Sequence, residues 1–434
     1  MALSSNLQGN KVFIVDGART PFLKAKGKPG AFVAADLAVS AARPLVDRMP
    51  FDATAFDEVI MGCVMPNADE ANIARILALR IGCGERTPAW TVQRNCASGM
   101  QALDCAAQNI ATGRSDLILA GGVESMSHAP ILLNLLMVNW LADFSRAKTA
   151  MDKIKMVAKL RGPHLKPIIG LLRGLTDPTN GLSMGQTAEN LAHRFHIDRV
   201  TMDTYSMHSH HRLAKAQDEG YLADEIVDIF DSKGNLYKED DGVRRDSDLP
   251  GLAKLKPVFD RHFGKVTAGN SAQVTDGAAV LILASEKAVR DHKLPVLARI
   301  TDAQWSGLDP AEMGLGPAYA MTPILDRNKL SIKDVDYWEI NEAFATQVLA
   351  CREAWMSEQY CRDFLGRDKP IGEIPMDRLN VDGGGVSVGH PVGASGARIT
   401  LHLAHILKRT NSKRGIASLC IGGGQGGALL IERE

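Results

Sequence analysis

One pattern occurs twice in this chain of 434 residues, once toward each end. An Ala-Ser-Gly tripeptide at 97–99 opens a segment with apolar residues at helical spacing, and an apolar strand then ends at Gly-Gly, 121–122. The tripeptide recurs at 394–396, where a second helical segment and a second strand lead to Gly-Gly at 422–423. Because turn, helix, strand and double glycine follow in the same order both times, the sequence predicts two similar halves built on a duplicated fold.

Short apolar runs rich in β-branched residues alternate with helical segments along the chain. The expected strands lie at 12–15, 58–61, 117–120, 279–283 and 416–420. Alternating strands and helices are typical of an α/β architecture in which helices cover the sheets. The chain is too long for one ordinary core, so roughly two to three domains are expected.

Composition and charge exclude several classes of protein. Acidic and basic residues balance at 50 each, so no overall charge attracts nucleic acid. No apolar run is long enough to span a bilayer, and residues 1–9 lack the basic and apolar regions of a secretory signal. The seven scattered cysteines suit a reducing compartment better than a disulfide framework. We therefore expect a cytoplasmic protein.

The segment 131–175 differs from both halves, because basic and apolar side chains interleave along it. It contains eight Lys or Arg residues and two acidic residues. Basic amphipathic segments of this kind lie on membrane surfaces or dock partner proteins. The alternative is an ordinary pair of surface helices that packs one apolar face on the core.

Cys96 stands where the first of the repeated helices is expected to begin. Free backbone N–H groups and the helix dipole at such a position favour a thiolate and can bind a developing oxyanion. The small residues at 97–99 leave room for a substrate to approach the sulfur. The alternative is a small buried core residue, the more common environment of a cysteine.

Three further segments carry candidate residues. His390 lies between glycines and before a proline, which indicates a tight loop; it is either a base for a thiol or a turn histidine that bonds the backbone. Cys420 ends a strand before a glycine-rich loop whose N–H groups can face a ligand, although a buried cysteine in a glycine-rich hairpin is equally compatible. Asn341, in Asn-Glu-Ala-Phe, can orient a water or an oxyanion.

In this order the segments resemble the thiolase family over nearly the whole chain. The matching segments are 12–22, 95–99, 121–127, 183–189, 267–270, 276–279, 341–344, 389–391 and 420–424. The resemblance implies a thiolase-like α/β fold of duplicated halves, with layered helices and mixed sheets, and an inserted loop domain. The implied boundaries are 1–127 and 267–295 for the N-terminal half, 128–266 for the inserted loop domain, and 296–434 for the C-terminal half.

The resemblance also implies a role for each candidate residue. Cys96 would be the acylated nucleophile, His390 its base, and Cys420 the acid/base at the α-carbon of acetyl-CoA. His390 and a water held by Asn341 would form one oxyanion hole for the enolate. The backbone N–H groups of Cys96 and Gly422 would form a second hole for the tetrahedral intermediate.

Three more residues are expected from the resemblance to line the binding site for substrate and coenzyme A: Ser183, Met184 and Ser271. The family often places a small hydroxyl residue where this chain has Ala272, so Ser271 beside it is the candidate for that contact. Coenzyme A would serve as co-substrate, and the chemistry requires no metal and no redox cofactor.

The expected activity is thiolytic cleavage of 3-ketoacyl-CoA in fatty-acid β-oxidation. The long insertion resembles the thiolase subunit of β-oxidation complexes, which implies a homodimer or tetramer, a hydratase/3-hydroxyacyl-CoA dehydrogenase partner, and a membrane contact through 131–175. Those complex-forming thiolases often carry His at the position of Asn341, so an acetoacetyl-CoA thiolase that condenses acetyl-CoA is the alternative. A ketoacyl synthase or a non-catalytic lipid-binding relative is disfavoured, because Cys96, His390 and Cys420 are all present.

Overall fold

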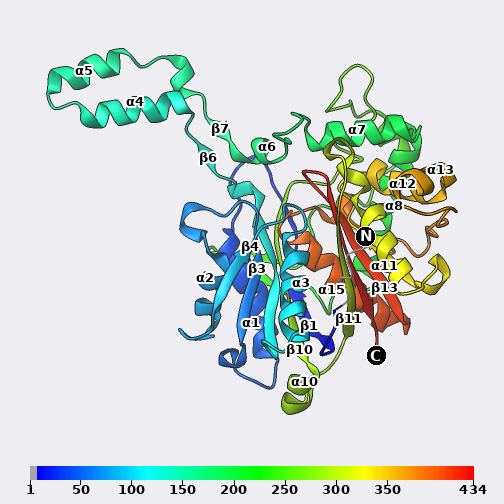
Figure 1. Ribbon diagram of the computed structural model, residues 1–434. Coiled ribbons are helices and arrows are strands. Elements are labelled where there is room, and N and C mark those ends of the chain that lie inside the picture. Colours follow the sequence, from blue (N-terminus) through cyan, green and yellow to red (C-terminus); the bar gives the residue numbers. More distant parts are fainter. Residues whose placement is uncertain (1–6) are drawn as a thin grey trace.

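The computed structural model describes residues 7–434 (Figure 1). The expectation that the chain carries no secretory signal rests mostly on residues 1–6, which lie outside the described residues. Among the described residues, no helix combines the length and the apolarity needed to cross a bilayer.

A ten-stranded sheet runs through both halves of the molecule. Along the sheet, the strands of the first half are β4 (Ala89–Val92), β3 (Glu58–Gly62), β5 (Leu117–Ser125), β10 (Thr275–Ser285) and β1 (Val12–Arg19), with the short β2 (Leu23–Lys24) on β10. The strands of the second half are β11 (Ala298–Gly307), β14 (Gln425–Glu432), β13 (Arg414–Ile421) and β12 (Tyr337–Ile340).

The two halves repeat one pattern of strand pairing. In the first half β3 is parallel to β5, and the pairs β5–β10 and β10–β1 are antiparallel. In the second half β12 is parallel to β13, and the pairs β13–β14 and β14–β11 are antiparallel. The antiparallel pair β1–β11 joins the halves into one sheet. The duplicated α/β fold predicted from the repeated sequence pattern is thus confirmed.

One detail of the predicted repeat is wrong. The second Gly-Gly pair follows β13, as expected, but the first lies inside β5, where Gly121 and Gly122 pair with Val280 and Ala279 of β10. The reason is close packing, because a Cβ on Gly122 would lie 2.0 Å from the carbonyl oxygen of Gly393.

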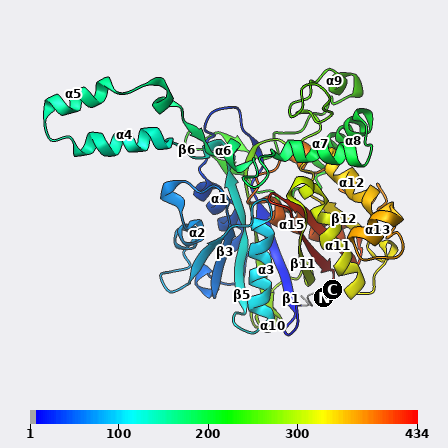
Figure 2. The same ribbon diagram turned by 45° about the horizontal axis from the view of Figure 1, so that its top comes forward.

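Helices form three layers around the sheet (Figures 1 and 2). Helices α1 (Ala34–Asp47) and α2 (Ile73–Ile81) cover one face of the first half, and α11 (Gly316–Arg327) and α12 (Ala345–Met356) cover one face of the second. Helices α3 (Ser98–Ala111) and α15 (Ser395–Thr410) share a central core with strands of both halves. The smaller helices at the periphery are α10 (Glu286–His292) and α13 (Glu358–Phe364).

Helices α3 and α15 meet closely where both begin. A Cβ on Gly99 would lie 2.7 Å from the carbonyl oxygen of Gly393, and one on Gly396 would lie 2.6 Å from the backbone nitrogen of Met100. Glycine is required at both positions because backbone fills the space. This contact brings together the loops that precede the two helices, and these loops carry Cys96 and His390.

The insertion between β5 and β10 divides into a packed part and a projecting part. The packed part contains α7 (Met184–Arg194), α8 (Arg199–Asp218), α9 (Leu249–Ala253) and the hairpin of β8 (Ile229–Phe230) with β9 (Leu236–Tyr237). Helix α8 lies against α12 and against the single turn α14 (Gly385–Val388) that precedes His390.

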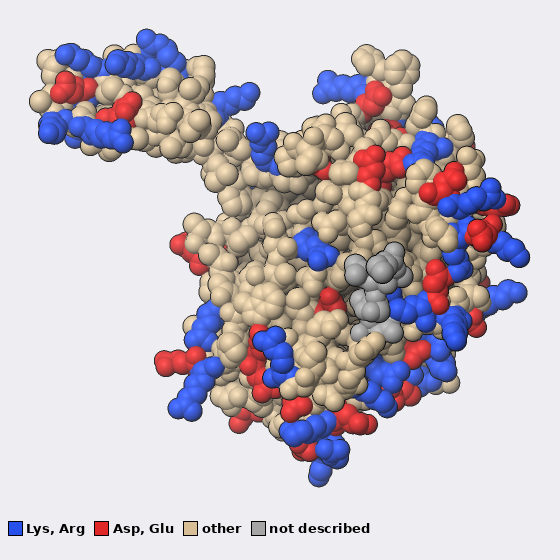
Figure 3. Space-filling view, viewed as in Figure 1, with Lys and Arg blue, Asp and Glu red and all other residues tan. Residues whose placement is uncertain are grey.

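The projecting part, which we call the arm, is a hairpin of α4 (Leu135–Arg146) and α5 (Ala150–Ala158) that stands away from the body (Figures 1 and 2). Its base is formed by β6 (Ile131–Leu132), β7 (Ile168–Ile169) and α6 (Gly170–Gly174). Neither long helix has a buried residue. The alternative that these helices pack one face on the core is therefore wrong. Lys and Arg side chains line the arm (Figure 3).

Candidate active site

A cavity of about 300 Å³ lies where loops of both halves and of the insertion meet. Six of the residues predicted for the site line it, namely Cys96, Ser183, Met184, Ser271, His390 and Cys420. Much of the remaining lining is apolar: Met126, Leu172, Leu175, Phe259, Met313 and Phe344. Two cysteines and a histidine that are remote in the sequence therefore face one apolar hollow.

The loop before α3 presents Cys96 to this cavity. Asn95 has a φ of +43°, and the Ser98 hydroxyl donates to the Asn95 carbonyl at 2.8 Å and accepts from the Arg94 N–H at 2.8 Å. Burial raises the pKa of the Cys96 thiol, while the backbone N–H groups of Gly422 and of Cys96 itself act in the opposite direction by facing the sulfur. These are the two N–H groups expected to form an oxyanion hole.

The Gly422 peptide is held in place from two sides. The Asn95 side-chain amide donates to the Gly422 carbonyl at 2.7 Å. On the other side the sulfur of Met184 packs closely, because a Cβ on Gly422 would lie 3.2 Å from it. The orientation of the Gly422 N–H toward Cys96 is therefore fixed by neighbours from the other half and from the insertion.

His390 is held in one orientation and, by inference, in one tautomer. Its Nδ1 lies 2.6 Å from the Ser395 hydroxyl, which itself donates to the Pro391 carbonyl at 3.0 Å. The Ser395 oxygen must therefore accept, so Nδ1 carries the proton and Nε2 is free to act as a base. Burial, and then the Arg398 charge, lower the pKa of His390 to about 4, so the ring is neutral near pH 7.

Asn341 lies beside the His390 ring. Its side-chain nitrogen is 3.4 Å from each ring nitrogen, and its backbone N–H donates to the Ser418 carbonyl at 2.9 Å. Its side-chain oxygen is buried and has no hydrogen-bond partner among the described residues. An amide with free capacity next to a neutral imidazole can help to bind an oxyanion.

Cys420 lies on β13, one residue before the strand ends, and is almost fully buried. Burial raises the pKa of its thiol well above the usual range, and the sulfurs of Cys96 and Cys351 raise it further. Cys420 therefore carries its proton near neutral pH, which suits a proton donor. Cys351, on α12, donates to the Gly314 carbonyl at 3.3 Å, and no motif in the sequence pointed to it.

The hydroxyl groups expected to contact substrate already have partners in the protein. Ser183 caps α7 by accepting from the Gln186 N–H at 3.3 Å, and Ser271 donates to the Thr267 carbonyl at 2.7 Å. Ala272, the position of the family's frequent hydroxyl residue, also lines the cavity. Both serines can still accept a hydrogen bond through a remaining lone pair.

Glu124 is a buried residue beside the loop after His390, and the sequence did not single it out. It accepts hydrogen bonds from the N–H groups of Val64, Met65 and Gly393, at 2.9, 2.9 and 3.1 Å. Burial raises the pKa of its carboxyl group to about 7. Its hydrogen bonds connect the loop after His390 to the first half. Ser395 was also missed, and its position at the first turn of the second repeated helix was the available signal.

Comparisons with known proteins match nearly the whole chain. The thiolase N-terminal domain matches residues 12–287, and the thiolase C-terminal domain matches residues 294–433. The 3-ketoacyl-CoA thiolases of Aliivibrio fischeri (strain MJ11) and Serratia proteamaculans (strain 568) are each 36% identical to this chain, over 98% of it and over 96% and 98% of their own lengths.

Two solved structures are similar over nearly the full length. Bacillus anthracis acetyl-CoA acetyltransferase has a TM-score of 0.84 and 37% identity, covering 98% of this chain and 99% of its own. Human mitochondrial 3-ketoacyl-CoA thiolase in complex with CoA has a TM-score of 0.84 and 37% identity, covering 99% of each chain. The chain belongs to the thiolase family.

Proposed function

We propose that this protein cleaves 3-ketoacyl-CoA with coenzyme A, giving acetyl-CoA and a shortened acyl-CoA. As a thiolase it is an acyltransferase. The observation that supports this reaction is the convergence of Cys96, His390 and Cys420 on one apolar cavity. The proposed steps use coenzyme A as co-substrate and need no further cofactor.

In the first step Nε2 of His390 accepts the Cys96 proton while the sulfur attacks the C3 carbonyl of the substrate. The oxyanion that forms faces the N–H groups of Cys96 and Gly422, and each such donor contributes about 3–4 kcal/mol in comparable sites. Collapse of this intermediate breaks the C2–C3 bond. The electron pair moves into the thioester enolate, whose oxygen is stabilised by protonated His390 and by a water held by Asn341.

In the second step the Cys420 thiol protonates C2 of the enolate and acetyl-CoA leaves. The Cys420 thiolate then accepts the proton of an incoming coenzyme A thiol, which attacks the acyl-Cys96 carbonyl. Expulsion of the Cys96 thiolate releases the shortened acyl-CoA, and His390 returns the proton to that sulfur. The second cysteine is needed because proton transfer at carbon takes place away from the nucleophile.

We place the activity in fatty-acid β-oxidation, because the apolar lining of the cavity suits an acyl chain. Rates measured across 3-ketoacyl-CoA chain lengths test this assignment. Efficient turnover of 3-ketohexadecanoyl-CoA is expected. Negligible turnover of that substrate, with rapid cleavage of acetoacetyl-CoA, would instead support an acetoacetyl-CoA thiolase that condenses acetyl-CoA.

A Cys96→Ser variant separates the proposed reaction from other classes. Acetyl-CoA release by the wild-type protein should exceed that of the variant by orders of magnitude. Equal rates would support a non-catalytic lipid-binding relative. Decarboxylation of carrier-protein thioesters without thiolysis would support a ketoacyl synthase.

We further propose a homodimer or tetramer in the cytoplasm that associates with a hydratase/3-hydroxyacyl-CoA dehydrogenase subunit. All seven cysteines are unpaired, which suits a reducing compartment. Sedimentation of the purified protein, alone and mixed with such a subunit, tests the assembly. A monomer in both samples contradicts it.

The arm is proposed to dock on an anionic membrane surface. Its exposed apolar residues include Leu135, Met151 and Ile154, whose relative solvent accessibilities are 70%, 61% and 63%. Basic side chains surround them, and anionic headgroups attract such a combination of charge and apolar surface.

Co-sedimentation with vesicles of phosphatidylglycerol and phosphatidylcholine tests the arm. Binding should be lost in Ile154→Glu and retained in Val200→Glu, a similarly exposed apolar position outside the arm. Equal binding by both variants, or binding to the partner subunit alone, would contradict the membrane assignment.

A further inference from the structure

Glu342 is a buried carboxylate adjacent to Asn341 that the steps above do not use. It is 1% exposed and lies in the loop between β12 and α12. A buried carboxylate is costly unless each oxygen is hydrogen-bonded. The groups that satisfy Glu342 come from three separate segments of the chain.

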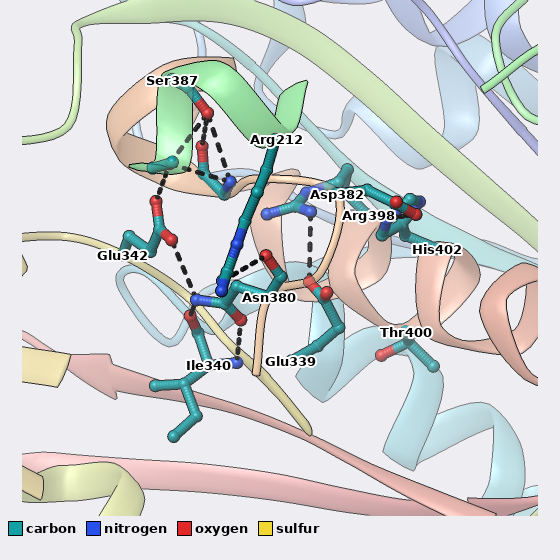
Figure 4. Close-up of polar contacts among 12 residues, drawn as sticks. Arg212, Glu339, Ile340, Glu342, Asn380, Asp382, Ser387, Arg398, Thr400 and His402 are labelled. Carbon is teal, nitrogen blue, oxygen red and sulfur yellow. Dashed lines mark hydrogen bonds and ion pairs between the residues drawn. The ribbon is translucent and has the colours of Figure 1, made fainter. Parts of the chain in front are cut away.

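Four donors surround the Glu342 carboxylate, and Figure 4 shows the contact with Asn380. Oε1 accepts from the Tyr205 hydroxyl at 2.8 Å and from the Asn380 side-chain amide at 3.0 Å. Oε2 accepts from the Ser209 hydroxyl at 2.7 Å and from the Val386 N–H at 3.1 Å. A carboxylate has about four acceptor positions, so this one is fully used.

Two of these donors belong to the insertion. Tyr205 and Ser209 are one turn apart on α8, so both side chains lie on the same face of that helix. The Glu342 carboxylate therefore joins the insertion to the loop that carries Asn341.

The other two donors, Asn380 and Val386, lie close to the loops that carry Asn341 and His390. Val386 lies in α14, which ends at Val388, two residues before His390. The turn wraps closely around Glu342, because a Cβ on Gly384 would lie 2.5 Å from the Glu342 carboxyl carbon and one on Gly385 would lie 2.7 Å from its carbonyl oxygen.

Asn380 holds the residue that precedes Asn341. Its side chain accepts from the Ile340 N–H and donates to the Ile340 carbonyl, both at 2.9 Å. The same amide group reaches Glu342. The backbone on both sides of Asn341 is therefore fixed by one hydrogen-bonded cluster (Figure 4).

We propose that Glu342 is a positioning residue for the enolate step: it fixes Asn341 relative to His390 and links this geometry to α8. The proposal rests on the function proposed above. His390 has anchors of its own in Ser395 and in the Gln273 carbonyl, which accepts its N–H at 3.1 Å. The oxyanion hole for acylation uses N–H groups of Cys96 and Gly422, which have no hydrogen bond to Glu342. Loss of Glu342 should therefore affect enolate formation more than acyl transfer.

Two partial reactions of the intact protein separate these steps. Exchange of the C2 hydrogens of acetyl-CoA with D2O requires the enolate, whereas exchange of labelled coenzyme A into acetyl-CoA requires only acylation and deacylation of Cys96. In Glu342→Gln, an NH2 group replaces one carboxylate oxygen. This group cannot accept the two hydrogen bonds that the oxygen accepted. Deuterium exchange should fall about 10- to 100-fold and coenzyme A exchange less than about 3-fold.

A double-mutant cycle tests whether the effect passes through Asn341. Tyr205→Phe should lower deuterium exchange about 10-fold in the wild-type background and have no further effect in Asn341→Ala. The matched control is Glu339→Gln, a neighbouring buried carboxylate on β12 whose hydrogen bond is to Arg398 at 3.4 Å. It should leave the ratio of the two exchange rates unchanged.

Equal losses in both exchanges for Glu342→Gln, or additive effects in the cycle, would overturn the proposal and leave Glu342 a purely structural residue. Failure of the proposed function itself has a different signature, because the wild-type protein would then catalyse neither exchange.

Discussion

Helices α3 and α15 occupy equivalent positions in the two halves, yet different side chains hold them. Helix α3 buries mainly small and aliphatic residues, with one carboxyl group, Asp104, bonded to the Trp305 indole at 2.8 Å. Helix α15 buries three basic or titratable side chains, Arg398, His402 and His405. The duplication has thus kept strand pairing and helix placement while the buried polar groups diverged.

The charged groups on α15 connect distant parts of the chain. His402 lies between Glu225 of the insertion, at 2.9 Å, and Asp382 before α14, at 3.3 Å. Glu225 also pairs with Arg19 on β1 at 2.7 Å. The helix that follows the proposed base is therefore fixed by ion pairs in addition to apolar packing, whereas the helix that follows the proposed nucleophile depends mainly on apolar packing.

The largest effects are expected when the sulfurs of Cys96 and Cys420 are removed one at a time. Cys96→Ala should abolish both acyl transfer and thiolysis, with a loss of at least about 10⁴-fold, because the covalent intermediate cannot form. Cys420→Ala should reduce thiolysis comparably while Cys96 is still acylated by acetyl-CoA, as measured by mass spectrometry of the intact protein. Acylation that persists in Cys96→Ala, or disappears in Cys420→Ala, would contradict the assignment of roles.

The second prediction concerns the ion pairs of α15. Burial lowers the pKa of His402, but the carboxylates of Glu225 and Asp382 have a larger effect and raise that pKa to about 10. A raised pKa means that the protonated ring stabilises the fold fully below its unfolded pKa of about 6.5, and that this stabilisation is lost as the pH rises toward 10. His402→Gln should therefore cost about 3 kcal/mol near pH 6 and progressively less at higher pH.

Thermal unfolding of the two proteins from about pH 6 to 10 measures this trend. His405→Gln is the matched control on the same helix, because burial lowers the pKa of His405, so this ring gives no charge-dependent stabilisation that is lost as the pH rises toward 10. A deficit for His402→Gln that does not shrink at high pH would show that packing, and not charge, anchors α15.

The third prediction concerns the crossing of the two helices. Gly99→Ala or Gly396→Ala places a methyl group within 2.7 Å of backbone, so each should lower the free energy of unfolding by about 3 kcal/mol. Gly162→Ala in the arm, where no atom lies within 4 Å of the new methyl group, should change it by less than about 0.5 kcal/mol. Equal effects at all three positions, measured by denaturant unfolding, would show that the helix starts can separate.

The sequence predicted the fold and six residues of the cavity lining because both depend on local signals. The repeated turn, helix and strand pattern carried the duplication, and the motifs around Cys96, His390 and Cys420 carried the site. Features that depend on long-range packing were not predictable. The glycines inside β5 read as a strand end because nothing local marks the approach of Gly393. The sequence of the arm was also compatible with a helix pair packed on the core, because amphipathic spacing does not indicate what covers the apolar face.

Buried polar partners were the other omission. Glu342 looks like one acidic residue in a loop, and its four donors are spread from Tyr205 to Val386, so no spacing in the sequence links them. Glu124 likewise joins segments remote in the chain. The composition of a motif indicates which atoms react, whereas the groups that orient those atoms become visible only in the folded structure.

The smallest expected effect comes from the hydroxyl that orients His390. Ser395→Ala removes the acceptor for Nδ1–H, so the ring is free to rotate or change tautomer, and kcat for thiolysis should fall about 10-fold with little change in KM. Because burial and Arg398 keep the pKa of His390 near 4, the acidic limb of kcat/KM in the wild-type protein should lie below about pH 5. Thr400→Val is the matched control, since that hydroxyl donates to the Gly396 carbonyl on the same helix at 2.8 Å and has no contact with the imidazole. If Ser395→Ala retained full kcat, the orientation of His390 would have to come from Asn341 and the backbone. The first turn of α15 would then contribute nothing to the orientation of His390.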